Sequence, residues 1–476
     1  MEKKISADIL NTYPSIDENE AEKLLQGEIN SSNKKIVVLD DDPTGVQTVH
    51  DVSVYTDWSL DSIRKGFAEK NRLFYILTNS RGFTVEQTTK AHREIAETVA
   101  QVAQETGREY LFMSRSDSTL RGHYPLETKL LKEGVEKSQD IQIHGEIICP
   151  FFKEGGRFTI GNTHYVQYGE ELVPAAQTEF ARDKTFGYTH SDICEYVEEK
   201  TKGQYKASDV TCISLEDIRQ MNVDKIADQL CEVENFNKIV INAIDYVDVK
   251  IAAAAIYRAM KRGKNFMFRT AAALVKEMGG ISAQPLLTRE KMVVKETDNG
   301  GVIVVGSHTQ KTTAQLEKLK ELDGIVSVEF NSDLVLDEEL FKEETKRVTE
   351  KIGKIVASGK TAVAYTKRKL LVVENDTKED ALIRSVKISD AVQSLVGNLE
   401  VVPSFVIAKG GITSSDVGTK ALKVKRATVM GQIRPGIPVW QTGEESKFPF
   451  TPYVIFPGNV GDVNTLYEAA EILMKK

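Results

Sequence analysis

Short apolar segments alternate with longer amphipathic segments along most of this chain. KIVVLD (35–40), LFYILTN (73–79) and EYLFMSR (109–115) are typical of buried strands, and the segment at 84–105 has apolar residues at helical spacing. Strands that alternate with helices form mostly parallel sheets with helices on both faces. The pattern therefore predicts an α/β fold, in which ligands bind at the carboxyl ends of the strands.

A polar segment rich in glycine and proline interrupts this alternation at 279–301. The alternation starts again at 301–322 with a strand, a short loop and a helix. We therefore predict two α/β domains with largely parallel sheets, preceded by a polar lead-in. The lead-in covers residues 1–34, the first domain 35–290 and the second domain 291–476.

Composition excludes several classes of partner. The net charge of −8 argues against nucleic acid, because phosphate backbones require clustered Lys and Arg. The four cysteines show no CxxC spacing, which disfavours zinc and disulfides and fits a reducing compartment. The N-terminus lacks the apolar run of a secretory signal, and no stretch of about 18 uncharged apolar residues suits a membrane. We expect a cytoplasmic enzyme with no nucleic-acid or membrane partner; a homo-oligomer is left open.

Three aspartates follow the first predicted strand, in IVVLDDDPTG (36–45). Like charges repel one another unless something binds them. Carboxylates at a strand end can accept hydrogen bonds from sugar hydroxyls, take a proton or hold a metal, and Gly45 allows close approach of the backbone. A turn with capping aspartates is the alternative explanation.

Arginine and hydroxyl side chains follow the next strands. LTNSRGF (77–83) contains Arg81, and SRSDSTLRGHYPLE (114–127) contains two arginines, an aspartate and four hydroxyl residues. CPFFKEGGRFTIGNTHYV (149–166) adds Arg157. Guanidinium groups can bind a carboxylate with two hydrogen bonds, so these loops suit a polyhydroxylated anion. Helix caps, a hairpin and internal salt bridges would also account for these residues.

Three glycine-rich loops follow strands of the second predicted domain. VIVVGSHTQKTTAQL (302–316), FVIAKGGITSSDVGTKAL (405–422) and IFPGNVGDVNTL (455–466) each lead from a strand into a helix. Backbone amides at the start of a helix suit phosphate. No loop matches GxxxxGK[ST] or GxGxxG, so plain strand-to-helix turns remain an alternative.

The opening motif also matches a phosphatase signature. Haloacid-dehalogenase-type phosphatases carry a strand followed by DxDx[TV], whose first aspartate is the nucleophile, and Asp40, Asp42 and Thr44 fit that spacing. YILTNS (75–80) supplies the later strand that ends in Thr or Ser. The lysine and the final acidic pair of such enzymes are not evident. This interpretation also leaves the second domain without a role.

Several short motifs occur in order along the chain: DDxTG (41–45), TNSR (78–81), RSDSTLRG (115–122), PxFxxxGR (150–157), FARD (180–183), GS (306–307), GGxTS (410–414) and GNxG (458–461). In these motifs the chain resembles the four-carbon acid sugar kinase family, from about residue 35 to 470. Arg115 stands where the family has lysine, and Pro43 where leucine is usual, which bears on the identity of the sugar.

The resemblance implies an N-terminal domain that binds the acid sugar, a C-terminal domain that binds ATP, and an active site in the cleft between them. The implied reaction uses ATP and Mg²⁺ to phosphorylate the terminal hydroxyl of threonate, erythronate or 3-oxo-tetronate. The phosphatase using Asp40, or a non-catalytic sugar-acid-binding protein, is the alternative function.

The resemblance also assigns site residues, although it identifies no metal ligand. Asp42 and Asp117 are the candidate bases, and Arg81 and Arg121 are expected to hold the substrate carboxylate. Asp40 is expected to be dispensable. The implied substrate-binding residues are Asp41, Thr44, Ser80, Arg81, Arg115, Ser118, Arg121 and Arg157. The implied nucleotide-binding residues are Ser307, Gly410, Gly411, Ile412, Thr413, Gly458 and Asn459.

Overall fold

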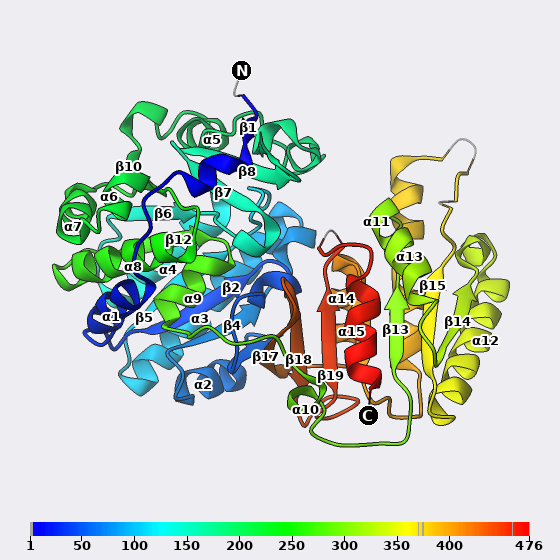
Figure 1. Ribbon diagram of the computed structural model, residues 1–476. Coiled ribbons are helices and arrows are strands. Elements are labelled where there is room, and N and C mark those ends of the chain that lie inside the picture. The colour runs from blue at the N-terminus through cyan, green and yellow to red at the C-terminus, as the bar shows by residue number, and fades with distance from the viewer. Residues whose placement is uncertain (1–2, 370, 374–375, 459, 476) are drawn as a thin grey trace. The chain divides into compact units, whose positions relative to one another are not determined.

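A computed structural model describes residues 3–369, 371–373, 376–458 and 460–475 of the chain (Figure 1). The chain divides into two compact units. The first unit contains the residues up to Gly45 together with Asp57–Ala283, and the second contains Val46–Thr56 and Gln284–Lys476. The two units are described separately below.

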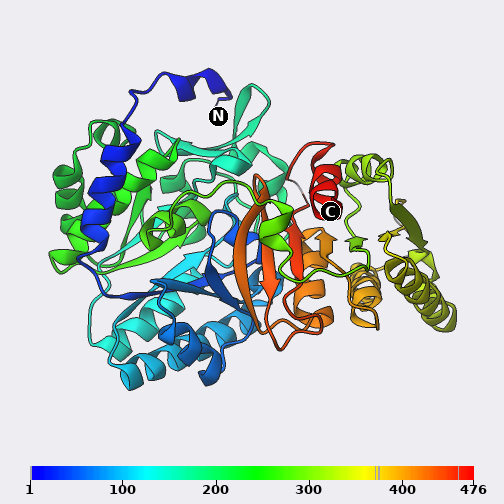
Figure 2. The ribbon, with the colours of Figure 1, turned by 60° about the horizontal axis from the view of Figure 1, so that its bottom comes forward.

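Unit 1 is built on a parallel sheet of seven strands, in the order β10-β11-β6-β12-β5-β2-β4. Two groups of packed helices, α1, α7, α8 and α9 and then α2, α3 and α4, lie on opposite sides of it (Figures 1 and 2). The strands are β2 (Lys35–Asp40), β4 (Leu73–Leu77), β5 (Tyr110–Arg115), β6 (Gly145–Cys149), β10 (Thr211–Ile213), β11 (Asn237–Ile241) and β12 (Phe266–Thr270). The helices are α1 (Glu18–Ile29), α2 (Leu60–Ala68), α3 (Val85–Thr106), α4 (Leu126–Gln139), α7 (Val223–Glu232), α8 (Tyr246–Lys261) and α9 (Ala272–Gly279).

A second, antiparallel sheet in unit 1 has the order β1-β9-β8-β7. Its strands are β1 (Ile5–Ser6), β7 (Arg157–Ile160), β8 (Thr163–Tyr168) and β9 (Glu171–Pro174). The glycine-bearing segment at 149–166 therefore forms a β-hairpin, whose turn residues Gly161 and Asn162 both have positive φ. Behind this sheet, Val166 and Tyr196 share a hydrophobic cluster with Leu120.

Unit 2 contains a mixed sheet in the order β3-β17-β18-β19-β16-β13-β15-β14. The five strands from β19 to β14 are parallel, and β3, β17 and β18 are antiparallel. The strands are β3 (Val52–Tyr55), β13 (Val302–Val305), β14 (Ile325–Phe330), β15 (Thr361–Thr366), β16 (Val406–Lys409), β17 (Arg426–Arg434), β18 (Ile437–Thr442) and β19 (Pro452–Phe456). The helices are α11 (Gln310–Leu319), α12 (Glu338–Ala357), α13 (Lys378–Gly397), α14 (Gly411–Asp416) and α15 (Thr465–Met474).

The α/β class with largely parallel, helix-flanked sheets is therefore confirmed. β3, which follows the triple aspartate, pairs antiparallel with β17 and lies in unit 2. The sequence division at residue 290 groups it with the first domain, because a strand's partner cannot be read from its own residues. Within the described part of the chain, no helix has the length and apolarity needed to cross a bilayer.

Candidate functional site

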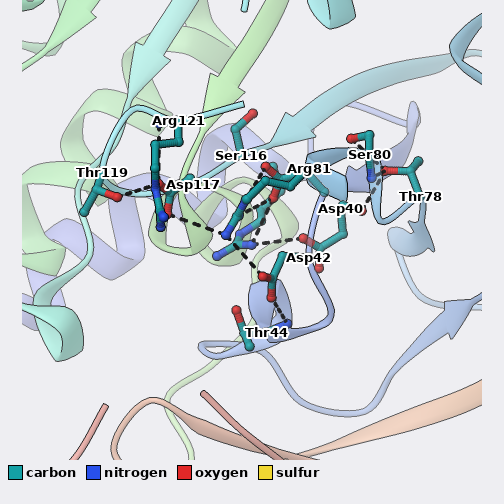
Figure 3. A network of polar contacts seen from close by, with 12 residues as sticks. Asp40, Asp42, Thr44, Thr78, Ser80, Arg81, Ser116, Asp117, Thr119 and Arg121 are labelled. Atoms are coloured by element: carbon teal, nitrogen blue, oxygen red, sulfur yellow. Dashed lines mark hydrogen bonds and ion pairs between the residues drawn. The ribbon is translucent and has the colours of Figure 1, made fainter. Parts of the chain in front are cut away.

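Polar side chains of unit 1 converge at the carboxyl ends of β2, β4 and β5, which are neighbours in the sheet (Figure 3). Asp40 ends β2, and Arg115 is its register partner at the end of β5. Arg81 lies in the short helix η3 (Ser80–Gly82) that follows β4. Because these strands are parallel, loops that are far apart in the sequence meet at this edge.

Arg81 is bound to the aspartates that follow β2. Its Nε and Nη2 donate to Asp41 Oδ2 at 3.1 Å and Oδ1 at 2.6 Å, which is a bidentate pair. Its Nη1 donates to Asp42 Oδ2 at 3.1 Å and lies 3.8 Å from Asp117 Oδ1. The arginine expected to hold a substrate carboxylate is thus already neutralised by carboxylates of the chain.

Asp117 binds its partners from its own loop. Arg121 Nε donates to Asp117 Oδ2 at 2.6 Å, and the Thr119 hydroxyl donates to the same oxygen. Arg121 also lies 3.8 Å from Asp183, measured from Nη1 to Oδ2. Arg121 is therefore paired as well, although its side chain keeps 23% of its surface exposed.

Asp40 has a structural role that its sequence position did not suggest. Its side chain is buried, and Oδ1 accepts a hydrogen bond from Arg115 Nη1 at 3.1 Å. A Cβ atom at Gly45 would lie 2.0 Å from Asp40 Oδ1, so the backbone turn packs directly on this carboxylate. The expectation that Asp40 is dispensable ignores this pair, because removal of Asp40 would leave Arg115 buried without its shortest ion pair.

Burial and neighbouring arginines separate the pKa values of the four carboxyls. Burial raises the pKa of Asp40 to about 7 and also raises the pKa of Asp41, despite Arg115 and Arg81. Burial would also raise the pKa values of Asp42 and Asp117, but neighbouring arginines outweigh it. Arg81 lowers the pKa of Asp42, and Arg121 together with Arg81 lowers the pKa of Asp117. The neighbouring arginines therefore favour the charged form most strongly at Asp42 and Asp117.

Two of the implied substrate residues have partners within the loops. The Ser80 side chain is fully buried and donates to Glu127 Oε1 at 2.6 Å, and this hydrogen bond joins the 78–81 loop to the start of α4. The backbone N–H of Thr44 donates to Asp42 Oδ1 at 2.8 Å. Sequence inspection missed Glu127, since a glutamate at the start of a helix usually faces solvent.

The loop after β5 is held in place by donors from the surrounding elements, which sequence inspection also missed. Tyr188 and Tyr196 donate their hydroxyls to the carbonyls of Thr119 and Leu120, each at 2.8 Å. Arg269 Nη2 donates to the carbonyl of Leu120 at 3.2 Å and to that of residue 121 at 3.1 Å. Sequence gave no sign of these partners, because each is distant in the chain and reaches backbone atoms.

A buried histidine completes this support. His164 Nε2 lies 2.7 Å from the carbonyl of Ser118, and Nδ1 lies 3.0 Å from the Thr159 hydroxyl. Burial lowers the pKa of His164 to about 4, so the ring is neutral and can donate from Nε2. Ser118, an implied substrate residue, is thereby fixed through its backbone carbonyl, and the residue keeps 8% of its surface exposed.

Arg157 differs from the other three arginines of this region. Its guanidinium carbon lies 5.3 Å from the centre of the Phe180 ring, and that of Arg121 lies 5.1 Å from the same centre. Its Nε is buried without a hydrogen-bond partner, and no carboxylate of the described chain pairs with it. Burial lowers the pKa of Arg157, although Asp117 acts in the opposite direction. Arg157 is therefore a partly buried cation without a counter-ion.

The glycine-rich loops of unit 2 also meet at one edge, because β19, β16 and β13 are adjacent and parallel. A Cβ atom at Gly306 would lie 2.3 Å from Thr413 Oγ1. Gly410 has φ of +120°, and its Cβ would lie 3.2 Å from Ser307 Cβ. The loops at 306–307 and 410–413 are thus in close contact; Gly306 is required by the space and Gly410 by its positive φ.

Lys409, which was not among the implied site residues, joins the third loop to these two. Its side chain is fully buried, and Nζ donates to the carbonyls of Pro457 at 2.6 Å and Gly458 at 3.3 Å. Burial lowers the pKa of Lys409 to about 7. The Ile412 side chain is exposed, and Asn459 lies outside the described residues.

Comparison with known proteins agrees with this division into two binding units. Residues 36–278 match the model of a sugar-binding N-terminal domain, and residues 302–466 match that of a nucleotide-binding C-terminal domain. None of the curated proteins matches the sequence.

Two solved structures share the fold. A Haemophilus influenzae protein of the family DUF1537 superposes with a TM-score of 0.59 at 16% identity, over 92% of this chain and 100% of that protein. A Salmonella typhimurium LT2 protein provisionally named a tRNA synthase has a TM-score of 0.62 at 15% identity, over 92% of this chain and 99% of that one. The two domain matches, in this order along one chain, are the architecture of a single family. The chain therefore belongs to the four-carbon acid sugar kinase family.

Proposed function

We propose that this protein is an ATP-dependent kinase that phosphorylates the terminal hydroxyl of a four-carbon acid sugar such as threonate, erythronate or 3-oxo-tetronate. Family membership supports a sugar ligand for the first predicted domain (35–290) and a nucleotide ligand for the second (291–476). The observation that carries the proposal is the charge pattern of unit 1: the aspartates and arginines that follow β2, β4 and β5 are paired with one another, whereas Arg157, which shares the Phe180 ring with Arg121, has no counter-ion among the described residues.

Arg157 is the arginine best suited to the carboxylate of the acid sugar. Arg81 and Arg121 would have to leave Asp41 and Asp117 to bind a carboxylate with their full charge. Arg157 has no such partner to lose, and its exposed face is available to a ligand. Aspartate oxygens and the hydroxyls of the same loops would accept and donate the hydrogen bonds of the sugar.

Asp42 is the base that the geometry favours for the attacking hydroxyl. Asp117 Oδ2 already accepts hydrogen bonds from Thr119 and Arg121, whereas the side chain of Asp42 keeps 17% of its surface exposed. A carboxylate with a lowered pKa can serve here, because phosphoryl transfer depends mainly on positioning and charge neutralisation. Asp117 would then orient Arg121 and the substrate.

In unit 2, the loops at 306–307 and 410–413 would receive the nucleotide phosphates through their backbone N–H groups. Lys409 keeps the Pro457–Gly458 turn in position beside them. Mg²⁺ carried on the phosphates neutralises their charge when bound. Among the described residues, no group of three His, Cys, Asp or Glu side chains is arranged to hold a metal by itself. Transfer requires the reacting atoms of the two ligands to meet, and we expect closure to achieve this.

The phosphatase alternative is disfavoured by the position of Asp40. A nucleophile must reach the phosphorus atom, but Asp40 keeps only 1% of its surface exposed and is bound to Arg115. The turn at Gly45 covers its other side. A non-catalytic acid-sugar-binding protein would explain unit 1, but it leaves the nucleotide-binding domain without a role.

The test is a screen of ATP-dependent phosphorylation with four-carbon acids of each configuration, followed by ³¹P NMR to locate the phosphate on the product. We expect one or a few acids to be phosphorylated at the terminal hydroxyl. Asp42→Asn should lower kcat by about 10²–10⁴-fold, the range of a lost general base, with little change in KM. Asp40→Asn should remain active. Phosphatase activity that depends on Asp40, or nucleotide turnover that no acid stimulates, would overturn the proposal.

A further inference from the structure

Unit 2 contains an arginine, Arg368, that has no counter-ion among the described residues. Arg368 lies two residues after the end of β15, which pairs in parallel with β13 (Figure 1). The carboxyl ends of both strands therefore lie at one edge of the sheet, and Gly306–Ser307 follow β13 at that edge. Arg368 is not among the ligand-binding residues that the sequence predicts.

The Arg368 side chain lies against the loop between β13 and α11. Nη2 donates to the carbonyl of Ser307 at 2.5 Å and to Thr313 Oγ1 at 3.0 Å, and Nε lies 3.3 Å from the same hydroxyl. Next to it, Thr366 Oγ1 lies 3.2 Å from His308 Nε2. The end of β15 thus contacts the residues that the family resemblance assigns to ATP.

One nitrogen of this guanidinium remains unused. Arg368 Nη1 is buried and has no hydrogen-bond partner, and over the part of the chain that is described no carboxylate forms an ion pair with Arg368. Burial lowers the pKa of Arg368, although Glu317 acts in the opposite direction. The adjacent Lys367, by contrast, is paired with Asp333 at 2.9 Å.

An unpaired donor on a buried charged group is unfavourable, so such groups usually have a partner that completes them. The partners of Arg368 within the chain are a carbonyl and a hydroxyl, neither of which carries charge. Among the described residues nothing supplies that partner, and an anion bound at the 307–313 loop would complete it. Planar guanidinium groups bind phosphate oxygens with two parallel hydrogen bonds.

We propose that Arg368 binds a phosphate group of the nucleotide and so determines the preference of this unit for a nucleoside di- or triphosphate over a nucleoside. The inference rests on the proposed function, in which unit 2 binds ATP. It adds a cation to a site that the sequence assigned only to glycines, Ser307, Ile412, Thr413 and Asn459. Ser307 then has a double role, since its carbonyl orients Arg368 while its backbone N–H faces the ligand.

The experiment measures binding of adenosine, AMP, ADP and ATP to the full chain by isothermal titration calorimetry. Arg368→Met should weaken ADP and ATP binding by about 10–100-fold, the range for hydrogen bonds between charged groups, and should leave adenosine binding unchanged. Arg368→Lys should recover part of the lost affinity, because it restores the positive charge but not the planar pair of hydrogen-bond donors. Lys367→Met is the matched control, since it removes a neighbouring cation that already has a partner.

Each outcome can be assigned to one cause. If Arg368→Met weakens adenosine and ADP equally, the side chain contacts the nucleoside or only supports the loop, and the proposal is wrong. Thermal unfolding without nucleotide separates these two cases. Unchanged ADP binding in Arg368→Met would also overturn the proposal. If the wild type binds no adenine nucleotide, the proposed kinase function fails first.

Discussion

At the scale of single residues, four arginines of the unit 1 loops look equivalent in the sequence, but they differ in their partners: Arg81, Arg115, Arg121 and Arg157. Arg115 binds Asp40 at the end of β2, Arg81 binds Asp41, and Arg121 binds Asp117. Arg157 stacks on Phe180 and has no carboxylate. The chemical type of a residue therefore predicts that it can bind an anion, whereas its partners decide whether it is free to do so.

Arg157 should discriminate the acid from neutral analogues. Arg157→Met is expected to lower kcat/KM for the acid sugar by about 10²–10³-fold, as expected for a lost charged pair, and to leave the rate with the corresponding amide unchanged. Steady-state kinetics with both compounds checks this. Lys153→Met is the control, because that exposed lysine is paired with Asp245. Equal losses for acid and amide would show that Arg157 acts through packing on Phe180.

Asp40 should make stability depend on pH. The folded chain holds a proton on Asp40 up to about pH 7, whereas the unfolded chain releases it near pH ~4. Between these values the folded state binds more protons, so the free energy of unfolding should fall as pH rises. Asp40→Asn removes this dependence, so the variant should lose about 2–3 kcal/mol less stability than the wild type between pH 5 and pH 8. Urea unfolding at several pH values measures it, and parallel curves would contradict it.

At the scale of elements, register explains why the cluster is so compact. Asp40 and Arg115 are direct partners in the β2–β5 ladder, so a salt bridge forms across the sheet edge without any movement of the loops. The loop after β5 is then fixed through backbone carbonyls by side chains from β8, β12 and α5 (Ile193–Lys200). A loop held in this way presents Asp117 in one position.

Arg269 donates to two carbonyls of this loop. Arg269→Met should leave the carbonyls of Leu120 and residue 121 without this donor and lower stability by about 1–3 kcal/mol. Because the loop carries Asp117, kcat/KM should fall by more than about 10-fold. Arg262→Met serves as the control, since it removes an arginine whose partner Asp228 is exposed. Wild-type kinetics in Arg269→Met would show that the loop does not need this support.

At the scale of the whole molecule, the chain passes from unit 1 to unit 2 three residues into the short helix η2 (Pro43–Val46) and returns after β3. Four residue pairs join β3 to β17, from Arg426 and Tyr55 to Val429 and Val52. An early segment of the chain is therefore part of the later unit. This arrangement predicts that the second unit is incomplete when it is cut at the sequence linker.

A fragment of residues 284–476 should be less stable than the same fragment joined to residues 46–56 through a flexible linker. Without β3, the β17 strand loses its partner and Val54 is absent from the core. We expect a difference in Tm on the order of 10 °C, from the apolar surface left unburied. Thermal unfolding of both fragments measures it. A fragment with Val54→Asp in the added segment is the control, and its Tm should not exceed that of residues 284–476 alone.

The sequence by itself determined the α/β class, the alternation of strands and helices, and the loops that carry polar residues. These follow from local periodicity and from the residue types at strand ends, which act over short distances. The family resemblance, confirmed by both domain matches, came from motifs of the same kind.

Tertiary structure decided which polar groups have partners. It paired Arg81 with Asp41, buried Asp40 against Arg115, and left Arg157 and Arg368 without a carboxylate. It also placed β3 in unit 2. The physical reason is the same in each case: an ion pair, a buried donor or a strand neighbour depends on a residue that is distant in the chain. Such partners meet only after the sheet edge has formed.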